Sequence, residues 1–313
     1  MKKFLGYPRI WWPQLRNSSK KVTTFNIQKI ICFAWTIFLV KLRLRGARPC
    51  TLSTQKKVLK LNRSTDLGSK NDIIHIETDD VIYKSVNLSG EWGKSESVFL
   101  AGLCCEKTTL IDLGANIGLI SRQILNVTKS ISKVLVIEPR AATMLNLRMN
   151  LQEISEARSL EIVFCQFALS EANGESYLYT ETSNIGNSSL RMELAPSASH
   201  EKVQTVTSET FYTSYLSKDE TYILKSDLQG MDAAVLNALP NDFWDQVLGA
   251  VIEVWPSKTV REIDILSLSK KLTERFQCSF SPTFTEVVDS RKLSEYWINS
   301  NNGSQNLYVR KIK

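Results

Sequence analysis

Acidic residues are absent from the first 65 positions of the chain, although these positions hold fifteen of its 39 Lys and Arg side chains. The remaining residues therefore contain 24 basic against 32 acidic side chains, so a basic arm precedes an acidic body with a net charge of −8. Binding to nucleic acid requires a basic face that neutralises phosphates. We therefore expect no nucleic-acid partner for the body.

An apolar run long enough to cross a membrane is also lacking in the arm. Its uncharged centre, IICFAWTIFLV at residues 30–40, would cover ~16 Å as a helix, about half of a ~30 Å hydrocarbon core. The basic KLRLR that follows disfavours a signal peptide or a signal anchor. Two interpretations stay open: residues 1–60 contact a membrane surface as an interfacial helix, or they form a basic helix packed on the body.

Cysteine pairs of the C-x-x-C type are missing among the six cysteines, and the adjacent Cys104 and Cys105 cannot easily bridge one another. This pattern supports neither a metal site nor a disulfide framework. It is typical of reduced thiols, so we expect a cytoplasmic protein, with peripheral attachment at the membrane surface if the first interpretation of the arm holds.

Strand-like and helical segments alternate through the body. Residues 42–70 are polar and basic and predict a linker, whereas IIHIETDDVIYKSV at residues 73–86 predicts a hairpin. A polar, hairpin-like insertion is expected between residues 174 and 211. Two late strands are expected near residues 279–288 and 306–312.

The alternation predicts an α/β, Rossmann-like domain whose mostly parallel central sheet has helices on both faces. We expect three parts in the chain: an arm and linker at residues 1–65, a small cap or hairpin region at residues 66–105, and the Rossmann-like domain at residues 106–313. A ligand should lie at the carboxyl ends of the strands, where the strand order reverses.

A turn rich in small residues joins the first strand of this domain to its helix, in LIDLGANIGLISRQIL at residues 110–125. Glycines there let the backbone approach a ligand, and the helix start offers free N–H groups. A dinucleotide fingerprint would need glycine at positions 116 and 119, where the chain has Asn116 and Leu119, so pyrophosphate fits poorly. The carboxylate of Asp112 instead attracts a cation such as an ammonium group.

Glu138 follows Gly114 by twenty-four residues, at the end of the second predicted strand. A carboxylate there can accept hydrogen bonds from both hydroxyls of a ribose. A ligand with a ribose, an amino-acid end and no phosphate is S-adenosylmethionine. The alternative is that Asp112 and Glu138 are ordinary strand-end carboxylates that cap helices or form ion pairs. The predicted cofactor residues are Asp112, Gly114, Ala115, Asn116, Gly118 and Glu138, with Phe167 and Ala168 as adenine contacts.

Six segments, in order, resemble the FkbM-type family of S-adenosylmethionine-dependent methyltransferases, from about residue 80 to residue 255. They are LIDLGANIGLIS, VLVIEPRAATMLNLRMNL, FALSEANGESYLY, NIGNSSL, TYILKSDLQGMDAAVLNAL and GAVIEV. Two positions depart from the family pattern: Asp232 stands where the family more often has Glu, and Ser226 stands where an aliphatic residue is usual. The resemblance implies a class I methyltransferase fold and O-methylation, commonly of sugar or natural-product hydroxyls.

Transfer of a methyl group to a hydroxyl requires alignment of the two reactants and removal of a proton. The two histidines, His75 and His200, lie outside the matched segments, so we expect a carboxylate to be the base. Asp227, after the fourth strand, is the predicted base or acceptor-orienting group. A cap for the following helix is the alternative role for Asp227.

Other polar residues are expected around Asp227. Glu253 and Asp232 are its predicted neighbours and the further candidate catalytic residues, and Lys225 can pair with either Asp227 or Glu253. In the insertion, Asn184, Asn187 and Ser188 can bind a polyhydroxylated acceptor or serve as ordinary turn residues. The basic, aromatic-rich arm would suit a glycolipid or membrane-linked polysaccharide as acceptor.

Several other functions remain open. A methyltransferase with a protein or another small-molecule acceptor would use the same cofactor site. A NAD-dependent oxidoreductase is disfavoured by the missing glycines of the phosphate turn. A base-flipping methyltransferase is disfavoured by the absence of an N-P-P-Y motif and by the acidic body. A non-catalytic binding module is disfavoured by the intact DLGANIG turn together with Glu138.

Overall fold

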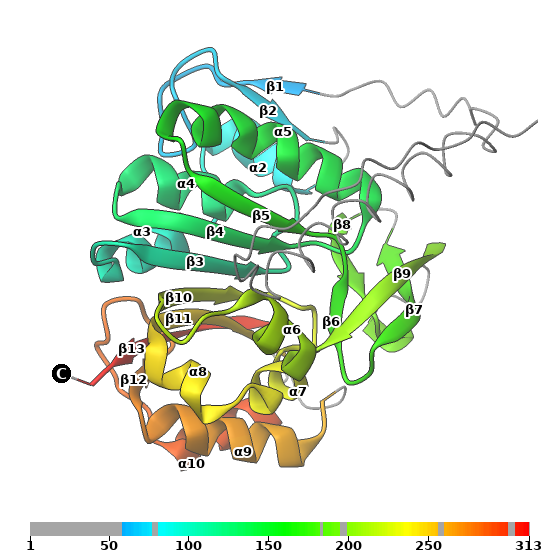
Figure 1. The fold of residues 1–313 in the computed structure, drawn as a ribbon, viewed down its shortest axis with the longest axis vertical. Helices are drawn as coiled ribbons and strands as arrows, with labels where there is room; N and C mark the ends of the chain where they lie inside the picture. The colour runs from blue at the N-terminus through cyan, green and yellow to red at the C-terminus, as the bar shows by residue number, and fades with distance from the viewer. Residues whose placement is uncertain are drawn as a thin grey trace, which may run out of the picture. The chain divides into compact units, whose positions relative to one another are not determined.

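A seven-stranded sheet forms the centre of the computed structural model, which describes residues 58–76, 81–181, 184–194, 199–255, 260–299 and 304–312 (Figure 1). In spatial order the strands are β5 (Glu161–Cys165), β4 (Ile131–Ile137), β3 (Thr108–Leu113), β10 (Thr221–Ser226), β11 (Val247–Val254), β13 (Gln305–Lys311) and β12 (Phe276–Ser279). The first five run parallel, and β13 is antiparallel to both of its neighbours. The predicted Rossmann-like class I methyltransferase fold, with a mostly parallel sheet, is therefore confirmed.

The strand order reverses between β3 and β10, where ligands bind in open sheets of this kind. Every residue of β3 is buried, because this strand has neighbours on both sides and core side chains on both faces. The register pairs Asp112 with Lys225 and Leu113 with Ser226. The glycine turn after β3 and the polar segment after β10 are thereby brought side by side.

Helices cover both faces of the sheet (Figure 1). One face is covered by α3 (Lys94–Leu103), α4 (Leu119–Val127) and α5 (Ala141–Arg158). The core of the other face includes residues of α6 (Ser208–Tyr215), α7 (Asp232–Ala238), α8 (Asn241–Gln246), α9 (Glu262–Thr273) and α10 (Ser290–Asn299). Apolar positions three or four residues apart in these helices, such as Ile265, Leu268 and Leu272 of α9, supply the buried side chains.

The predicted insertion forms a second sheet. Its strands, in spatial order, are β6 (Ala168–Ser170), β9 (Ser199–Thr207), β7 (Gly174–Glu181) and β8 (Asn184–Ser189), and the short 3₁₀ helix η1 (Met192–Leu194) follows β8. β7 is antiparallel to both β8 and β9, so the expectation of a hairpin-like insertion is confirmed. An ion pair of 3.0 Å between Arg140 Nε and Glu201 Oε1 joins the start of α5 to β9.

The segment predicted as a linker at residues 42–70 contains a strand in its described part, so the prediction is wrong there. β1 (Val58–Lys60) pairs antiparallel with β2 (Ile73–His75). Leu59 and Leu61 are buried with Ile74, whereas Val58 and Lys60 are exposed, which is the period of a strand with one buried face. The lysines and the arginine around these leucines masked that period in the sequence.

The hairpin predicted at residues 73–86 is also wrong, because its second arm is the helix α2 (Val81–Ser89). The buried residues of α2 are Ile82 and Val86, which are four positions apart and share one helix face. Gly90, with φ of 70°, follows the helix, and its N–H donates to the carbonyl oxygen of Val86. The short apolar run at the start of α2 fits the two-residue period of a strand as well as the helical period. The burial of Ile82 and Val86 on one face shows that it is a helix.

The end of the chain confirms one of the two late strands. β13 covers the predicted strand at residues 306–312, apart from its last residue. The other prediction, near residues 279–288, is wrong because β12 ends at Ser279 and α10 begins at Ser290. Pro282 has no N–H to donate to a strand ladder.

The predictions for the arm, including membrane contact, concern residues 1–57 almost entirely, and these lie outside the described residues. Within the described ranges, no helix combines the length and apolar character that crossing a bilayer requires. The described cysteines are all free thiols: Cys104, Cys105, Cys165 and Cys278.

Candidate active site

The turn between β3 and α4 is built by residues with left-handed backbone angles. Gly114, Asn116 and Gly118 have φ values of 72°, 51° and 81°. A Cβ atom on Gly114 would lie 1.9 Å from the carbonyl oxygen of Asp227, and one on Gly118 would lie 2.4 Å from Leu147 Cδ1. These glycines therefore let the turn pack tightly against β10 and α5, in addition to leaving the backbone open toward a ligand.

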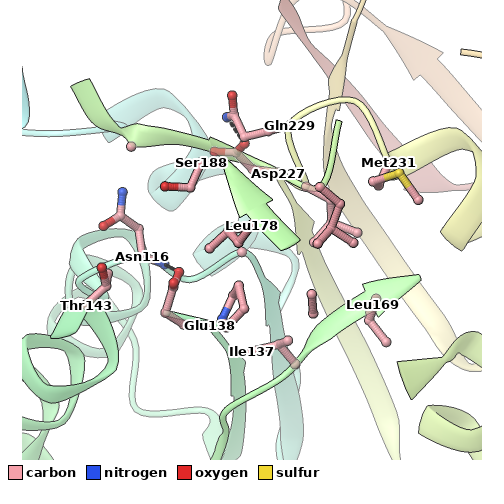
Figure 2. A pocket seen from close by; sticks show the side chains of 16 residues that line it. Asn116, Ile137, Glu138, Thr143, Leu169, Leu178, Ser188, Asp227, Gln229 and Met231 are labelled. Carbon is pink, nitrogen blue, oxygen red and sulfur yellow. Dashed lines mark hydrogen bonds between the residues drawn. The ribbon is translucent and has the colours of Figure 1, made fainter. Parts of the chain in front are cut away.

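Glu138 lies directly after β4, and backbone groups hold its carboxylate. Its Oε2 accepts a hydrogen bond of 3.2 Å from the N–H of Asn116, and its Oε1 accepts one of 2.9 Å from the N–H of Arg140. Burial raises the pKa of Glu138 to about 7, although these two hydrogen bonds act in the opposite direction. The side chain borders a cavity beside Asn116 (Figure 2).

This first cavity has about 620 Å³ of empty space, which includes the open solvent at its mouth. Of the predicted cofactor residues, Gly114, Asn116, Glu138 and Ala168 line it. Its remaining walls come from the start of α5, from the second sheet and from the turn after β10: Ile137, Pro139, Thr143, Leu169, Leu178, Gly186, Ser188, Leu190, Asp227, Leu228, Gln229 and Met231.

A second cavity, with about 850 Å³ of empty space, lies next to the first. The two cavities share Asn116, Gly186, Asp227 and Gln229. The second is lined by apolar residues from α2 and the start of α4, by Trp92, and by polar groups at the ends of β10 and β11: Val81, Ile82, Trp92, Ala115, Asn116, Ile117, Leu119, Ile120, Gly186, Asn187, Lys225, Asp227, Gln229 and Glu253.

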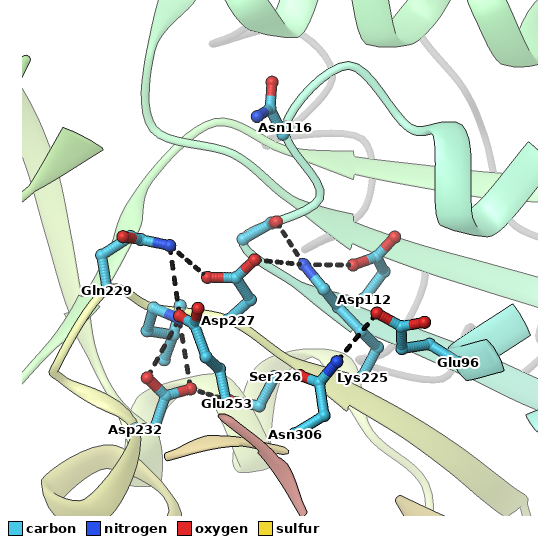
Figure 3. A network of polar contacts seen from close by, with 12 residues as sticks. Glu96, Asp112, Asn116, Lys225, Ser226, Asp227, Gln229, Asp232, Glu253 and Asn306 are labelled. Atoms are coloured by element: carbon cyan, nitrogen blue, oxygen red, sulfur yellow. Dashed lines mark hydrogen bonds and ion pairs between the residues drawn. The ribbon is translucent and has the colours of Figure 1, made fainter. Parts of the chain in front are cut away.

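A polar network joins the ends of the central strands (Figure 3). Lys225 Nζ donates to the carbonyl oxygen of Gly114 at 2.7 Å and forms 3.5 Å ion pairs with Asp112 Oδ1 and Asp227 Oδ2. Gln229 Nε2 donates to Asp227 Oδ1 at 2.5 Å and to Glu253 Oε2 at 3.2 Å. The network thus connects two of the three predicted catalytic carboxyls, Asp227 and Glu253, to the glycine turn after β3.

The carboxyls of this network ionise at different pH values. Burial opposes the charge of Asp227, but the ammonium of Lys225 and the side-chain hydrogen bonds to Asp227 together outweigh burial and lower the pKa of Asp227. Burial and the negative charge of Asp227 raise the pKa of Glu253 well above its usual range. Asp227, whose side chain is 34% exposed, therefore has the lower pKa of the two, and Glu253 has the higher.

Asp232 lies beneath the site and lines neither cavity. Its Oδ1 accepts a hydrogen bond of 2.5 Å from Ser226 Oγ, and both of its carboxyl oxygens accept from the N–H of Leu228 at 3.1 Å. Burial raises the pKa of Asp232 to about 7. Asp232, rather than Asp227, therefore accepts the hydrogen bond from the backbone of the turn. Ser226 and Asp232, the two positions that depart from the FkbM-type pattern, are hydrogen-bond partners.

The other predicted cofactor residues do not line the first cavity. Phe167 is buried, its ring contacts Tyr215 at 5.5 Å between centroids, and it lines neither cavity. Ala115 borders the second cavity instead of the first, and Gly118 is the N-cap of α4. Asp112 is 1% exposed, and its Oδ2 accepts a hydrogen bond from Ser121.

The insertion contributes to both cavities through Gly186, Asn187 and Ser188. The ring of His200 contacts Tyr177 and Tyr179 away from both linings, and the N–H of His75 donates to Asn150. Among the described residues, no group of His, Cys, Asp or Glu is arranged to hold a metal ion.

Trp92 and the α2 residues of the second cavity were missed by sequence reasoning. They lie more than twenty residues before the glycine turn and belong to no motif. The glycines on either side of Trp92, Gly90 and Gly93, were the available signal of a sharp bend there.

Several solved structures resemble this chain at low identity. A methyltransferase FkbM from Methylobacillus flagellatus KT is 15% identical, with 65% of this chain and 43% of that chain covered and a TM-score of 0.40. An S-adenosylmethionine-dependent O-methyltransferase from Thermotoga maritima is 14% identical, with 82% and 78% covered and a TM-score of 0.34. TrmK from M. capricolum, in complex with S-adenosyl-homocysteine, is 7% identical, with 69% and 68% covered and a TM-score of 0.33.

The alignment with the FkbM methyltransferase spans less than half of that protein. No model of a protein family matches this chain, and no curated protein matches it. At such identities and scores the likeness bears on the fold at most, and the activity has to be inferred from the residues of this chain.

Proposed function

We propose that this protein is an S-adenosylmethionine-dependent O-methyltransferase of the FkbM type, which transfers a methyl group to a hydroxyl of a sugar or a related polyhydroxylated compound. The observation that carries the proposal is the meeting of two cavities at Asp227. One cavity has the features of a nucleoside site without phosphates. The other presents an ionised carboxylate to a second reactant.

The residues of the first cavity fit the cofactor. The buried carboxylate of Glu138 can accept hydrogen bonds from the two ribose hydroxyls, and Ala168 and Thr143 border the space for the adenine. Asp112 lines neither cavity, but its Oδ1 is buried without a hydrogen bond and lies 3.5 Å from Lys225 Nζ, which contacts Gly114 of the glycine turn, so it suits the ammonium group of the amino-acid end. When bound, the cofactor supplies a methyl group on a sulfonium sulfur.

Asp227 is suited to accept the proton of the acceptor hydroxyl. Lys225 and the hydrogen bonds to its carboxylate together lower its pKa, which favours the ionised form, and Gln229 fixes the orientation of the carboxylate. The raised pKa of Glu253, which Gln229 links to Asp227, favours its neutral form and so limits the negative charge beside Asp227. A base placed at the shared wall of two cavities can act on a hydroxyl that is aligned with the methyl group.

The walls of the second cavity favour a ring with one apolar face and several hydroxyls. Trp92, Ile82 and Ile117 form an apolar side, whereas Asn187, Lys225 and Gln229 offer hydrogen bonds. This combination suits a sugar, and the basic arm suits a glycolipid or membrane-linked polysaccharide, which would place the protein in the cytoplasm at the membrane surface. Transfer to a protein or another small molecule is the second candidate, because the cavity is open to solvent.

The test is methyl transfer from S-adenosylmethionine labelled on its methyl group to a membrane-containing extract. Label in the glycolipid or polysaccharide fraction, lost with Asp227→Asn and retained with the exposed control Asp242→Asn, is the expected result. Label in protein or nucleic acid would overturn the sugar acceptor. A wild-type chain that binds neither S-adenosylmethionine nor S-adenosyl-homocysteine in calorimetry would overturn the proposed activity.

A further inference from the structure

Lys225 places a buried ammonium group among three acceptors at the end of β10 (Figure 3). Its Nζ lies 2.7 Å from the carbonyl oxygen of Gly114 and 3.5 Å from both Asp112 Oδ1 and Asp227 Oδ2. A carbonyl oxygen and two carboxylates are the partners that any primary ammonium group prefers. The side chain thus occupies a site built for an ammonium ion.

Asp112 Oδ1 shows that Lys225 fills this site incompletely. Asp112 is 1% exposed, and its Oδ1 has no hydrogen bond, since Nζ at 3.5 Å is beyond good hydrogen-bond distance. A buried carboxylate oxygen without a hydrogen bond is costly, so a ligand that donates one there is stabilised. The structure therefore has a carboxylate oxygen next to Lys225 that lacks a hydrogen-bond donor.

Lys225 and two of its acceptors lie where the two cavities meet, with Asp112 buried behind them and outside both linings. Gly114 lines the first cavity, Lys225 lines the second, and Asp227 lines both. A nucleoside whose ribose contacts Glu138 and whose chain extends toward Asp227 passes the carbonyl oxygen of Gly114. An ammonium group at the end of that chain would meet the ammonium of Lys225.

We propose that Lys225 Nζ occupies the position of the cofactor's ammonium group. When the cofactor binds, its ammonium group displaces Nζ from Gly114 and Asp112. This inference rests on the proposed function. Two cations cannot share these acceptors at close range, because like charges repel strongly in a buried site. The flexible stem of lysine lets Nζ move on toward Asp227 and Glu253, both of which line the second cavity.

The displacement couples the two cavities. In the present arrangement Lys225 divides its charge between the cofactor turn and Asp227. After displacement the whole charge faces the carboxyls of the second cavity and stabilises their ionised forms. Cofactor binding thereby prepares the base for the acceptor, and competition with Lys225 weakens cofactor affinity.

The experiment compares two ligands by calorimetry in wild type and Lys225→Met. S-adenosyl-homocysteine has the amino-acid end, whereas 5′-methylthioadenosine has the same adenosine and thioether without it. Lys225→Met should increase the affinity for S-adenosyl-homocysteine by about tenfold, the equivalent of one charged hydrogen bond, and leave the affinity for 5′-methylthioadenosine unchanged. Lys133→Met, which removes an ion pair with Glu220 outside both cavity linings, should change neither affinity.

The other possible results would contradict either the displacement of Lys225 or the proposed function. An unchanged affinity ratio, or weaker binding of S-adenosyl-homocysteine alone, would mean that Lys225 is a structural residue or a contact for the ligand's carboxylate, and the displacement would be wrong. Failure of both ligands to bind the wild-type chain would overturn the proposed function itself. If Lys225→Met does not fold, Lys225→Gln allows the same comparison, because its amide keeps a donor but carries no charge.

Discussion

The two cavities hold their carboxyl groups in different ways. In the first, Glu138 is fixed by backbone N–H groups of Asn116 and Arg140. In the second, Asp227 and Glu253 are fixed by side chains, and the charge of each group depends on the others. A carboxyl held by the backbone can be changed by itself, whereas a change anywhere in the side-chain network alters all of it.

The largest effects are expected from two substitutions, Asp227→Asn and Glu138→Ala, each measured for both the rate of methyl transfer and the affinity for S-adenosyl-homocysteine. Asp227→Asn should lower the rate of methyl transfer by about 10²- to 10⁴-fold, as loss of a general base does, and change the affinity for S-adenosyl-homocysteine little. Glu138→Ala should weaken that affinity by about 10- to 100-fold, because two hydrogen bonds to a charged acceptor are lost. Calorimetry and transfer of labelled methyl groups measure the two quantities.

The exposed Glu161→Ala serves as the control for this pair. If Asp227→Asn weakened cofactor binding as strongly as Glu138→Ala does, the division of the site into a cofactor cavity and an acceptor cavity would be wrong.

The hydrogen bond between Ser226 and Asp232 should give a coupling of about 1–2 kcal/mol in a double-mutant cycle of unfolding free energies. Both side chains are 1% exposed, so neither has water as a replacement partner. Denaturant unfolding of Ser226→Ala, Asp232→Asn and the double variant measures this coupling. Strict additivity would show that the two side chains are not energetically coupled.

A smaller effect is expected from pH. The pKa of Glu138 is raised to about 7, so the carboxylate that we propose to bind the ribose forms as pH rises through 7, and affinity for S-adenosyl-homocysteine should increase between pH 6 and 8. Stability should change in the opposite direction. The folded chain keeps a proton on Glu138 that the unfolded chain releases near pH 4.5, so unfolding free energy falls as pH rises from about 4.5 to 7.

Glu138→Gln should remove both parts of this pH dependence, as measured by calorimetry and by denaturant unfolding. A wild-type affinity that is flat between pH 6 and 8 would contradict the role assigned to Glu138.

The central sheet and the first cavity were largely predictable, because their signals are local. A buried strand, a glycine turn and an amphipathic helix follow one another in LIDLGANIGLISRQIL, and Glu138 comes at the next strand end. The register that sets Asp112 beside Lys225 follows from parallel pairing of two recognisable strands. The fold therefore positions these side chains almost independently of the rest of the chain.

The second cavity was predictable only at its base, where Asp227, Glu253 and Lys225 end two central strands. Its walls depend on tertiary packing: Ile82 belongs to a helix that short-range alternation disguised as a strand, and Trp92 has no motif around it. Phe167 illustrates the reverse case. It follows a predicted strand as an adenine contact would, but packing against Tyr215 turns its ring into the core.

Gly186 belongs to the lining of both cavities, on a strand at the edge of the second sheet. The segment that delimits the acceptor space is thus carried by an insertion, whereas the base and the cofactor turn belong to the central sheet. β7 and β8 border the first cavity through Leu178, Gly186 and Ser188 and the second through Gly186 and Asn187, so exchange of these strands would change walls of both cavities while Asp227 and the glycine turn stay in the central sheet. The insertion is therefore the place to begin when engineering this protein toward new acceptors.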